Sequence, residues 1–318
     1  MNFFDLHCDT AFECTTQLGG RTLDEGAHHL SLDRGAYLDR WRQVFAIFMP
    51  DEDESGAPIR GDAAIAHYER VLAYIKRQAQ LFPDRFFICT DRETIERETP
   101  AGVCGAIISV EGGSAAAGSL ERIERMYADG VRMMTLTWNA ANEIACGVWA
   151  EPTGGLTPFG RQAVELMNRI GMTVDVSHLA DRGFYDVAEL TQRPFVASHS
   201  CSRELCNHRR NLTDEMFGII RDCGGLVGIN FSRGFLEVNE NAHLDHILRH
   251  TEHFLALGGE QTVCMGSDFD GTDMPDGVTG IESMGAVYER FLKAGYSQQL
   301  TDDIFYNNAA RFFGRALS

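Results

Sequence analysis

The sequence predicts an α/β fold, a single (β/α)8 TIM barrel, and two observations carry this prediction. Short apolar segments alternate with segments of helical periodicity along most of the 318 residues, which is typical of parallel β/α units. Eight such apolar segments fall within about 270 residues, which matches the strand count and the length of a barrel.

The amino-terminal half of the chain contains four predicted strands, whose unbroken apolar runs are typical of strands buried on both faces of a sheet. Residues 11–40 are polar and irregular, and a loop of this length is commonly functional. Apolar side chains at helical spacing predict a helix over residues 62–80. Ser119 as a cap and Gly130 after the last turn delimit a helix over 119–129. The four strands comprise residues 3–10, 44–49, 105–112 and 131–138.

The carboxy-terminal half repeats the same alternation. Thr157 and Pro158 mark the start of a helix as cap and first-turn proline, and Gly171 marks its end. Four further strands are predicted at residues 173–178, 194–199, 226–231 and 263–268. Helical patterns follow at residues 181–190, 213–223, 243–257, 282–294 and 301–317.

A doubly wound open sheet is the alternative to the barrel. No G-x-G-x-x-G motif follows any predicted strand, and no change of composition marks a second domain. We therefore expect one domain over residues 1–318.

Histidine and carboxylate side chains recur where the predicted strands end. A period of two places His7 and Asp9 on the same side of the first strand. In a barrel the carboxyl ends of the strands form the face that carries the active site. Six groups exceed the needs of one tetrahedral ion and suit two divalent ions that share a carboxylate. Nitrogen and oxygen ligands favour zinc, with manganese, cobalt or iron as alternatives. The six groups are His7, Asp9, Glu111, His178, His199 and Asp268.

Each of these residues also has a structural interpretation. A single histidine at a strand end is commonly a hydrogen-bonded structural residue, and Asp268 fits ordinary turn chemistry. These interpretations would have to hold independently at five strand ends, so the metal site is the better hypothesis. By contrast, we expect the histidines of residues 243–257 to lie on the solvent side of a helix outside the barrel. They are His243, His246, His250 and His253.

Composition restricts the partners and the compartment. A net charge of −18 argues against nucleic acid and anionic membranes as partners. No apolar run is long enough to span a bilayer, and the amino terminus lacks the features of a signal peptide. Nine cysteines without a C-x-x-C pair are typical of reduced thiols. We expect a cytoplasmic protein with a small-molecule substrate, and a homodimer is left open.

Longer motifs resemble the membrane (renal) dipeptidase family of zinc metallopeptidases, in the amidohydrolase superfamily. The resemblance covers nearly the whole chain, and its motifs are long and specific. They lie at residues 155–161, 168–172, 175–178, 198–200, 209–211 and 266–271.

The resemblance implies a barrel hydrolase with two zinc ions and a metal-bridging hydroxide that attacks the peptide bond of a dipeptide. It implies that His7 and Asp9 bind the first ion, and that Glu111 bridges both. His178 and His199 would bind the second ion. Two further roles also come from the resemblance: proton transfer and amine binding for Asp268, and binding of the substrate carboxylate for Arg210.

One position departs from the family pattern. Well-studied dipeptidases carry Leu-Thr-His at the fourth strand, and that histidine contacts the scissile carbonyl. Here Trp138 occupies the place of the imidazole and Asn139 follows it. An indole N–H donates one hydrogen bond but cannot titrate. We expect both residues to contact substrate. A related amidohydrolase acting on N-acyl amino acids, lactams or lactones is the alternative function, and a non-catalytic binding protein is a third.

Overall fold

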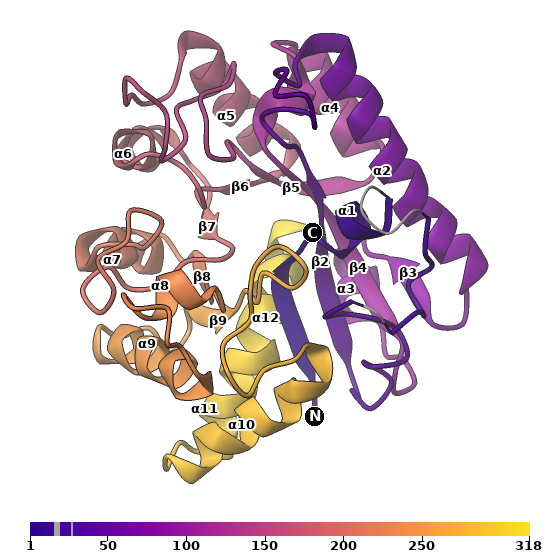
Figure 1. Ribbon diagram of the computed structural model, residues 1–318, viewed down its shortest axis with the longest axis vertical. Helices are drawn as coiled ribbons and strands as arrows, with labels where there is room; N and C mark the ends of the chain where they lie inside the picture. The colour runs from indigo at the N-terminus through magenta and orange to yellow at the C-terminus, as the bar shows by residue number, and fades with distance from the viewer. Residues whose placement is uncertain (16–19, 27) are drawn as a thin grey trace.

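A closed parallel β-barrel forms the centre of the computed structural model, which describes residues 1–15, 20–26 and 28–318 (Figure 1). The strand order is β2-β1-β9-β8-β7-β6-β5-β4, and β2 pairs with β4 to close the barrel. All pairs of neighbouring strands are parallel, so the predicted (β/α)8 barrel is confirmed. The barrel strands are β1 (Phe3–Cys8), β2 (Trp41–Phe48), β4 (Cys104–Glu111), β5 (Val131–Thr135), β6 (Thr173–Asp175), β7 (Val196–Ala197), β8 (Leu226–Ile229) and β9 (Val263–Met265).

A ninth strand, β3 (Phe86–Ile88), extends the sheet outside this count, and the sequence did not predict it. It pairs with the first residues of β4, from Cys104 to Ala106. The partner on that side changes to β5 from Ile108 onward. β3 therefore covers the part of β4 that β5 does not reach.

Helices surround the barrel, and their ends follow the predicted capping residues (Figure 1). The Ser119 hydroxyl accepts a hydrogen bond from the Arg122 backbone N–H, and Gly171 ends its helix with φ 84°. The helices are α1 (Thr10–Thr15), α2 (Gly61–Leu81), α3 (Arg92–Glu96), α4 (Leu120–Ala128), α5 (Pro158–Ile170), α6 (Asp181–Leu190), α7 (Asp214–Asp222), α8 (Arg233–Leu236), α9 (Leu244–Ala256), α10 (Met284–Lys293), α11 (Gln298–Asp302) and α12 (Asn308–Ala316).

Three short helices correct the prediction. α1 begins at Thr10, the last residue of the first predicted strand, and continues into residues 11–40, which were predicted to be irregular; α3 and α8 were not predicted. The predicted helix over 301–317 begins earlier and contains a π-helical turn, Asp303–Asn307, between α11 and α12. Helices of four to six residues have too few turns to show a periodic apolar pattern.

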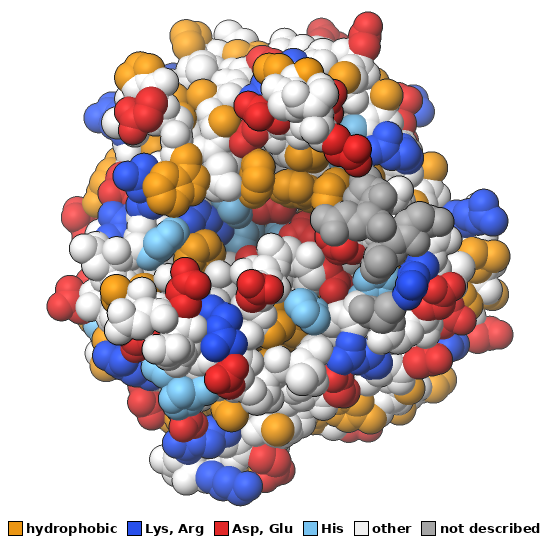
Figure 2. All heavy atoms as spheres, in the orientation of Figure 1, with side chains coloured by type: hydrophobic (Ala, Val, Ile, Leu, Met, Phe, Trp, Pro, Cys, Tyr) orange, Lys and Arg blue, Asp and Glu red, His pale blue; other side chains and the backbone are white. Residues whose placement is uncertain are grey.

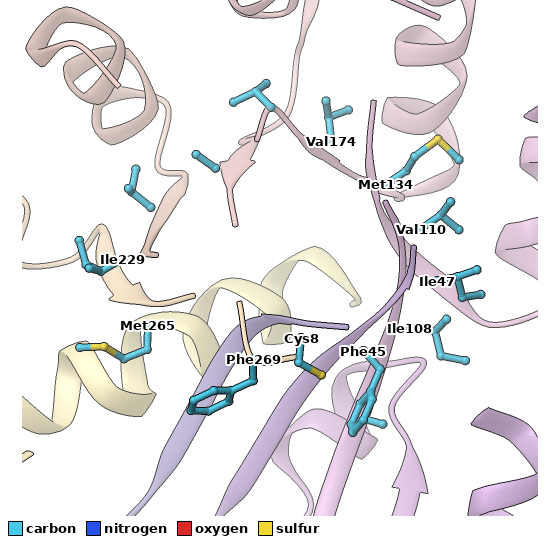
Figure 3. Packing of buried hydrophobic residues seen from close by; sticks show 14 of the residues in the cluster. Cys8, Phe45, Ile47, Ile108, Val110, Met134, Val174, Ile229, Met265 and Phe269 are labelled. Atoms are coloured by element: carbon cyan, nitrogen blue, oxygen red, sulfur yellow. The ribbon is translucent and has the colours of Figure 1, made fainter. Parts of the chain in front are cut away.

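Apolar side chains of the strands pack closely around the barrel wall (Figure 3). Phe45, Ile108 and Val110 are fully buried in the larger cluster. A smaller cluster joins other strand residues to Phe312 and Phe313 of α12. Closely packed side chains of this kind hold the strands in one register. The ends of the strands, where the candidate residues lie, are therefore held in fixed relative positions.

The solvent position predicted for the α9 histidines is wrong for His250, which is fully buried. Its Nδ1 accepts a hydrogen bond of 3.0 Å from the Ser202 backbone N–H. Its Nε2 lies 3.0 Å from the Leu236 carbonyl oxygen, to which it donates. The ring joins α9 to the loop after β7 and to the end of α8, an inward position that spacing along the helix does not reveal.

Two further properties concern compartment. In the described part of the chain, no helix has the length and apolarity required to cross a lipid bilayer. All nine cysteines are free thiols. The cytoplasmic localisation expected from the sequence stays a prediction.

Candidate metal centre and substrate cavity

The segments that follow the barrel strands surround a cavity of about 400 Å³. Figure 2 shows a hollow in the middle of this face, with histidine and acidic side chains gathered inside it. The lining includes every kind of residue predicted for the site: candidate metal ligands, the candidate proton-transfer residue and the candidate substrate contacts. Among them are Glu111, His178, Asp268, Arg210, Trp138 and Asn139.

Glu111, the last residue of β4, lies at the centre of the candidate metal ligands. Its Oε1 lies 2.9 Å from His178 Nε2 and 3.5 Å from His199 Nε2. Its Oε2 lies 3.4 Å from His7 Nε2. One oxygen of this carboxylate thus faces His178 and His199, and the other faces His7. This is the arrangement required of a carboxylate that bridges two cations.

Asp9 and Asp268 complete the cluster around His7. His7 Nε2 lies 3.4 Å from Asp9 Oδ2 and 3.9 Å from Asp268 Oδ1. Two overlapping groups each bring their ligand atoms within 4.8 Å of one another. The first group is His7, Glu111 and His199, and the second is His7, Asp9 and Asp268.

The donor atoms of this cluster fit divalent cations. Among the described residues, the buried Asp9 Oδ1 has no hydrogen-bond partner. His178 Nε2 and His199 Nε2 lie only 3.0 Å apart. Burial, and next the charge of Glu111, raise the pKa of Asp9 to about 8, a cost that a bound divalent ion would offset. Burial lowers the pKa of both imidazoles, which favours the neutral form that metal ligation needs.

Asn139 contacts His178. The two side chains meet at 3.1 Å, between His178 Nδ1 and Asn139 Oδ1. An amide oxygen only accepts hydrogen bonds, so this contact places the imidazole proton on Nδ1. The lone pair of Nε2 then points toward Glu111 and is available to bind a metal ion. Asn139, predicted to contact substrate, thus also orients a candidate metal ligand.

Buried carboxylates beneath the cluster were not predicted from the sequence. Asp175, at the end of β6, accepts hydrogen bonds from the backbone N–H groups of Ser177 and Ser198 at 3.0 and 2.9 Å. Asp5 of β1 accepts from the backbone N–H of Ser267 at 2.7 Å and from its hydroxyl at 2.6 Å. Asp175 therefore holds the serines that precede His178 and His199. Asp5 holds the serine that precedes Asp268. A carboxylate inside an apolar strand is itself unusual and is the signal that could have identified both.

Two of the candidate site residues have backbone conformations in the left-handed region of φ and ψ. His178 has φ 66° and Asp268 has φ 62°. Such conformations cost free energy in residues other than glycine, and they persist where the surrounding structure fixes them. Asn230, after β8, donates a hydrogen bond of 3.0 Å to Asp268 Oδ2 and helps to fix it. Like Asp5 and Asp175, Asn230 was not predicted from the sequence.

Arg210 lies in the loop after β7 and is 4% exposed. Its Nη2 donates to the His199 carbonyl oxygen at 3.3 Å, while its buried Nε has no hydrogen-bond partner among the described residues. Its guanidinium forms no ion pair with a carboxylate of the described residues. A buried cation without a carboxylate partner is a binding group for an anionic ligand. Arg209 instead stacks on Trp149, with its guanidinium carbon 4.2 Å from the ring centroid.

Trp138 lines the cavity in the segment after β5, two strands around the barrel from β7, which Arg210 follows. Its ring packs edge-on against Phe48, with the ring centroids 4.9 Å apart. The centroid of His178 lies 6.5 Å away. The structure thus brings all nine predicted site residues to one cavity or to its floor, and their individual roles stay predictions.

Comparisons with known proteins agree with this geometry. The family model for membrane dipeptidase, peptidase family M19, matches residues 1–317. An uncharacterised protein encoded in the pqqA 5′ region of Klebsiella pneumoniae is 33% identical over 250 residues, which cover 76% of this chain and 92% of that protein.

Two solved structures share the fold along their full length. The dipeptidase AC, a metallopeptidase of family M19, superposes with a TM-score of 0.89 at 28% identity, covering 100% of this chain and 99% of that one. A metallopeptidase from Rhodobacter sphaeroides, liganded with a phosphinate mimic of the dipeptide L-Ala-D-Ala, gives a TM-score of 0.90 at 26% identity, covering 99% of each chain.

Proposed function

The chain belongs to the membrane dipeptidase family, peptidase family M19, and we propose that it hydrolyses dipeptides with two bound zinc ions. One observation carries the proposal. The buried guanidinium of Arg210, which forms no ion pair with any described residue, shares a cavity with a cluster of carboxylate and imidazole groups. Such a cavity can bind a small molecule with a carboxylate at one end while its peptide bond lies at the ligand cluster.

The proposal divides the candidate ligands between two ions. His7 and Asp9 would hold the first ion, His178 and His199 the second, and Glu111 would contact both through its two oxygens. Bound divalent ions polarise a carbonyl group and lower the pKa of water, which supplies a nucleophile at neutral pH. The remaining steps depend on side chains of the chain itself.

In this proposal Asp268 moves the proton. Asn230 donates to its Oδ2, which leaves Oδ1 directed toward His7 and the ligand cluster. From there Oδ1 accepts a proton from the attacking water and passes it to the nitrogen of the leaving amine. The same carboxylate lies where the free amino group of the substrate would meet a negative charge.

Arg210 would bind the carboxylate of the substrate through two parallel hydrogen bonds. Its distance from Asp268 is fixed by the barrel, because the two residues follow β7 and β9, on either side of β8. Fixed positive and negative groups select a substrate by the separation of its own charges. A dipeptide has both charges close to the scissile bond, whereas a longer peptide carries one of them further away.

Hydrolysis of a substrate panel tests this function. The protein is assayed with L-Ala-L-Ala, L-Ala-D-Ala, a tripeptide, N-acetyl-alanine and a lactone, before and after chelation and zinc restoration. We expect cleavage of at least one dipeptide, no cleavage of the tripeptide, and loss and recovery of activity with the metal. Cleavage of N-acetyl-alanine or the lactone without any dipeptide would replace the proposal with the broader amidohydrolase function.

A further inference from the structure

We propose that Phe12, Phe48 and Trp138 form the subsite for the side chain of the substrate's amino-terminal residue, and that this side chain is large and apolar or aromatic. The inference rests on the proposed dipeptidase function and adds a substrate class to it. We call these three residues the aromatic wall.

The three rings of the aromatic wall form one continuous packed surface. Phe48 is the central ring: its centroid lies 4.9 Å from that of Phe12 and 4.9 Å from that of Trp138. The interplanar angles are 86° and 83°, so both contacts are edge-to-face. Aromatic rings packed in this way gain energy beyond area burial and hold one another in place. The wall is therefore formed before any substrate binds.

All three rings remain partly exposed and line the cavity of about 400 Å³. Partly exposed aromatic rings that border a concave site are typical of surfaces that bury part of a ligand. Their position in the barrel is equally informative. Phe12 follows β1, Phe48 ends β2 and Trp138 follows β5, so the wall covers one side of the barrel mouth.

The position of the wall identifies the substrate residue. Around the barrel, β2, which carries the central Phe48, lies opposite β7, whereas β5, which precedes Trp138, lies two strands from β7. Arg210 follows β7 and packs near Phe235 of α8, with its guanidinium carbon 5.3 Å from that ring centroid. A substrate whose carboxylate binds Arg210 has its carboxy-terminal residue on that side. Its scissile carbonyl must reach the ligand cluster, so its amino-terminal residue lies beyond the cluster, toward the aromatic wall.

Trp138 determines the chemistry of this subsite. Its indole ring offers a large apolar face and one N–H donor, and it cannot carry a positive charge. Burying an aromatic side chain against such a surface raises kcat/KM by about 10- to 100-fold relative to alanine. Glu13 also lines the cavity, so a substrate with an amino-terminal lysine is included in the test as the competing class.

The experiment compares two dipeptide series on the zinc-loaded enzyme. In the first, the amino-terminal residue of X-Ala is Ala, Leu, Phe or Lys; in the second, the carboxy-terminal residue of Ala-X is Ala, Leu or Phe. We expect kcat/KM for Phe-Ala to exceed that for Ala-Ala by about 10- to 100-fold, with a smaller gain for Ala-Phe. Trp138→Ala should lower the ratio of Phe-Ala to Ala-Ala to near one.

Trp149→Ala is the matched control, because Trp149 is a second tryptophan of the same cavity that stacks on Arg209. It should keep the wild-type ratio. If wild-type enzyme cleaves Ala-Ala but gains nothing from Phe-Ala, or prefers Lys-Ala, the subsite assignment is wrong and the dipeptidase function stands. If metal-loaded enzyme cleaves no dipeptide, the proposed function fails, and this inference fails with it. Because the wild-type series alone decides these outcomes, the test does not depend on the folding of a variant.

Discussion

Ser198 Oγ lies 2.7 Å from His199 Nδ1. The same hydroxyl lies 2.6 Å from Asp175 Oδ2, to which it donates. Its oxygen is then free to accept the proton of His199 Nδ1, which leaves the His199 Nε2 lone pair directed at Glu111. A carboxylate, a hydroxyl and an imidazole thus form one chain that fixes the tautomer and orientation of a candidate metal ligand.

We expect Ser198→Ala to weaken metal binding by about 10- to 100-fold, because removal of groups that orient a metal-ligating histidine has this effect. Competition with a chromophoric chelator measures the affinity without reference to activity. Ser200→Ala is the control, since Ser200 lies on the other side of His199, is equally buried, and its hydroxyl has no partner among the described residues. Equal losses in both variants would show that the hydroxyl chain does not orient His199.

Glu111 is expected to determine the number of bound ions. Elemental analysis of the purified wild-type protein should find close to two divalent ions per chain, and Glu111→Ala should lose at least one, because both sides of the cluster share this carboxylate. A wild-type protein that is fully active with a single ion would contradict the two-ion arrangement.

Much of this architecture could be predicted because it depends on local patterns. Residue alternation and the position of His7 and Glu111 at strand ends follow from spacing along the chain, whereas Asp268 lies three residues beyond the end of β9. The last residues of β5 to β9 could not be predicted from the apolar runs, because these runs continue beyond the last strand-to-strand hydrogen bonds. At β6 the side chain of Asp175 takes over backbone N–H groups that a longer ladder would use.

Site residues that are positioned by contacts far apart in the sequence could not be predicted either. Asn230 reaches Asp268 across 38 positions of the chain, and Asp5 reaches Ser267 across 262. Neither pair has a local sequence signature, because the partners meet only after the barrel closes. The same holds for His250, whose inward orientation depends on its partner Ser202, 48 positions away.

His250 should make the stability of the fold dependent on pH. Burial lowers its pKa to about 4, whereas a histidine in the unfolded chain titrates near 6.5. Between these values the unfolded chain binds a proton that the folded chain does not. Its stabilising contribution is therefore complete above about pH 6.5 and is lost as the pH falls toward about 4, a change of roughly 3 kcal/mol at most.

Denaturant titrations between pH 7.5 and 4.5 measure this change in the free energy of unfolding. His250→Asn keeps an acceptor for the Ser202 N–H and cannot titrate. It should be less stable than wild type at neutral pH, with the difference narrowing as the pH falls. A constant difference over this range would show that the charge of His250 does not contribute.

Arg210 should bind the substrate carboxylate, so that a dipeptide amide is a poor substrate. Arg210 is 4% exposed, and its Nε has no partner among the described residues, so the ligand supplies the missing acceptor. Loss of one side of a buried charge-assisted pair costs roughly 2–5 kcal/mol, which corresponds to about 30- to 4000-fold in kcat/KM. Arg210→Ala should show a loss of this order with a free dipeptide while its metal content stays intact.

The amide of the same dipeptide separates recognition of charge from general damage to the site. Wild-type enzyme should cleave the free acid far better than the amide, and Arg210→Ala should discriminate little between them. Arg209→Ala is the matched control, since Arg209 is exposed, stacks on Trp149 and donates to the Val148 carbonyl oxygen. It should retain the wild-type preference for the acid, because its guanidinium already has partners within the protein. If the wild-type enzyme cleaves the amide and the acid equally well, Arg210 does not bind the substrate carboxylate. The spacing between Arg210 and Asp268 would then have no part in selecting dipeptides.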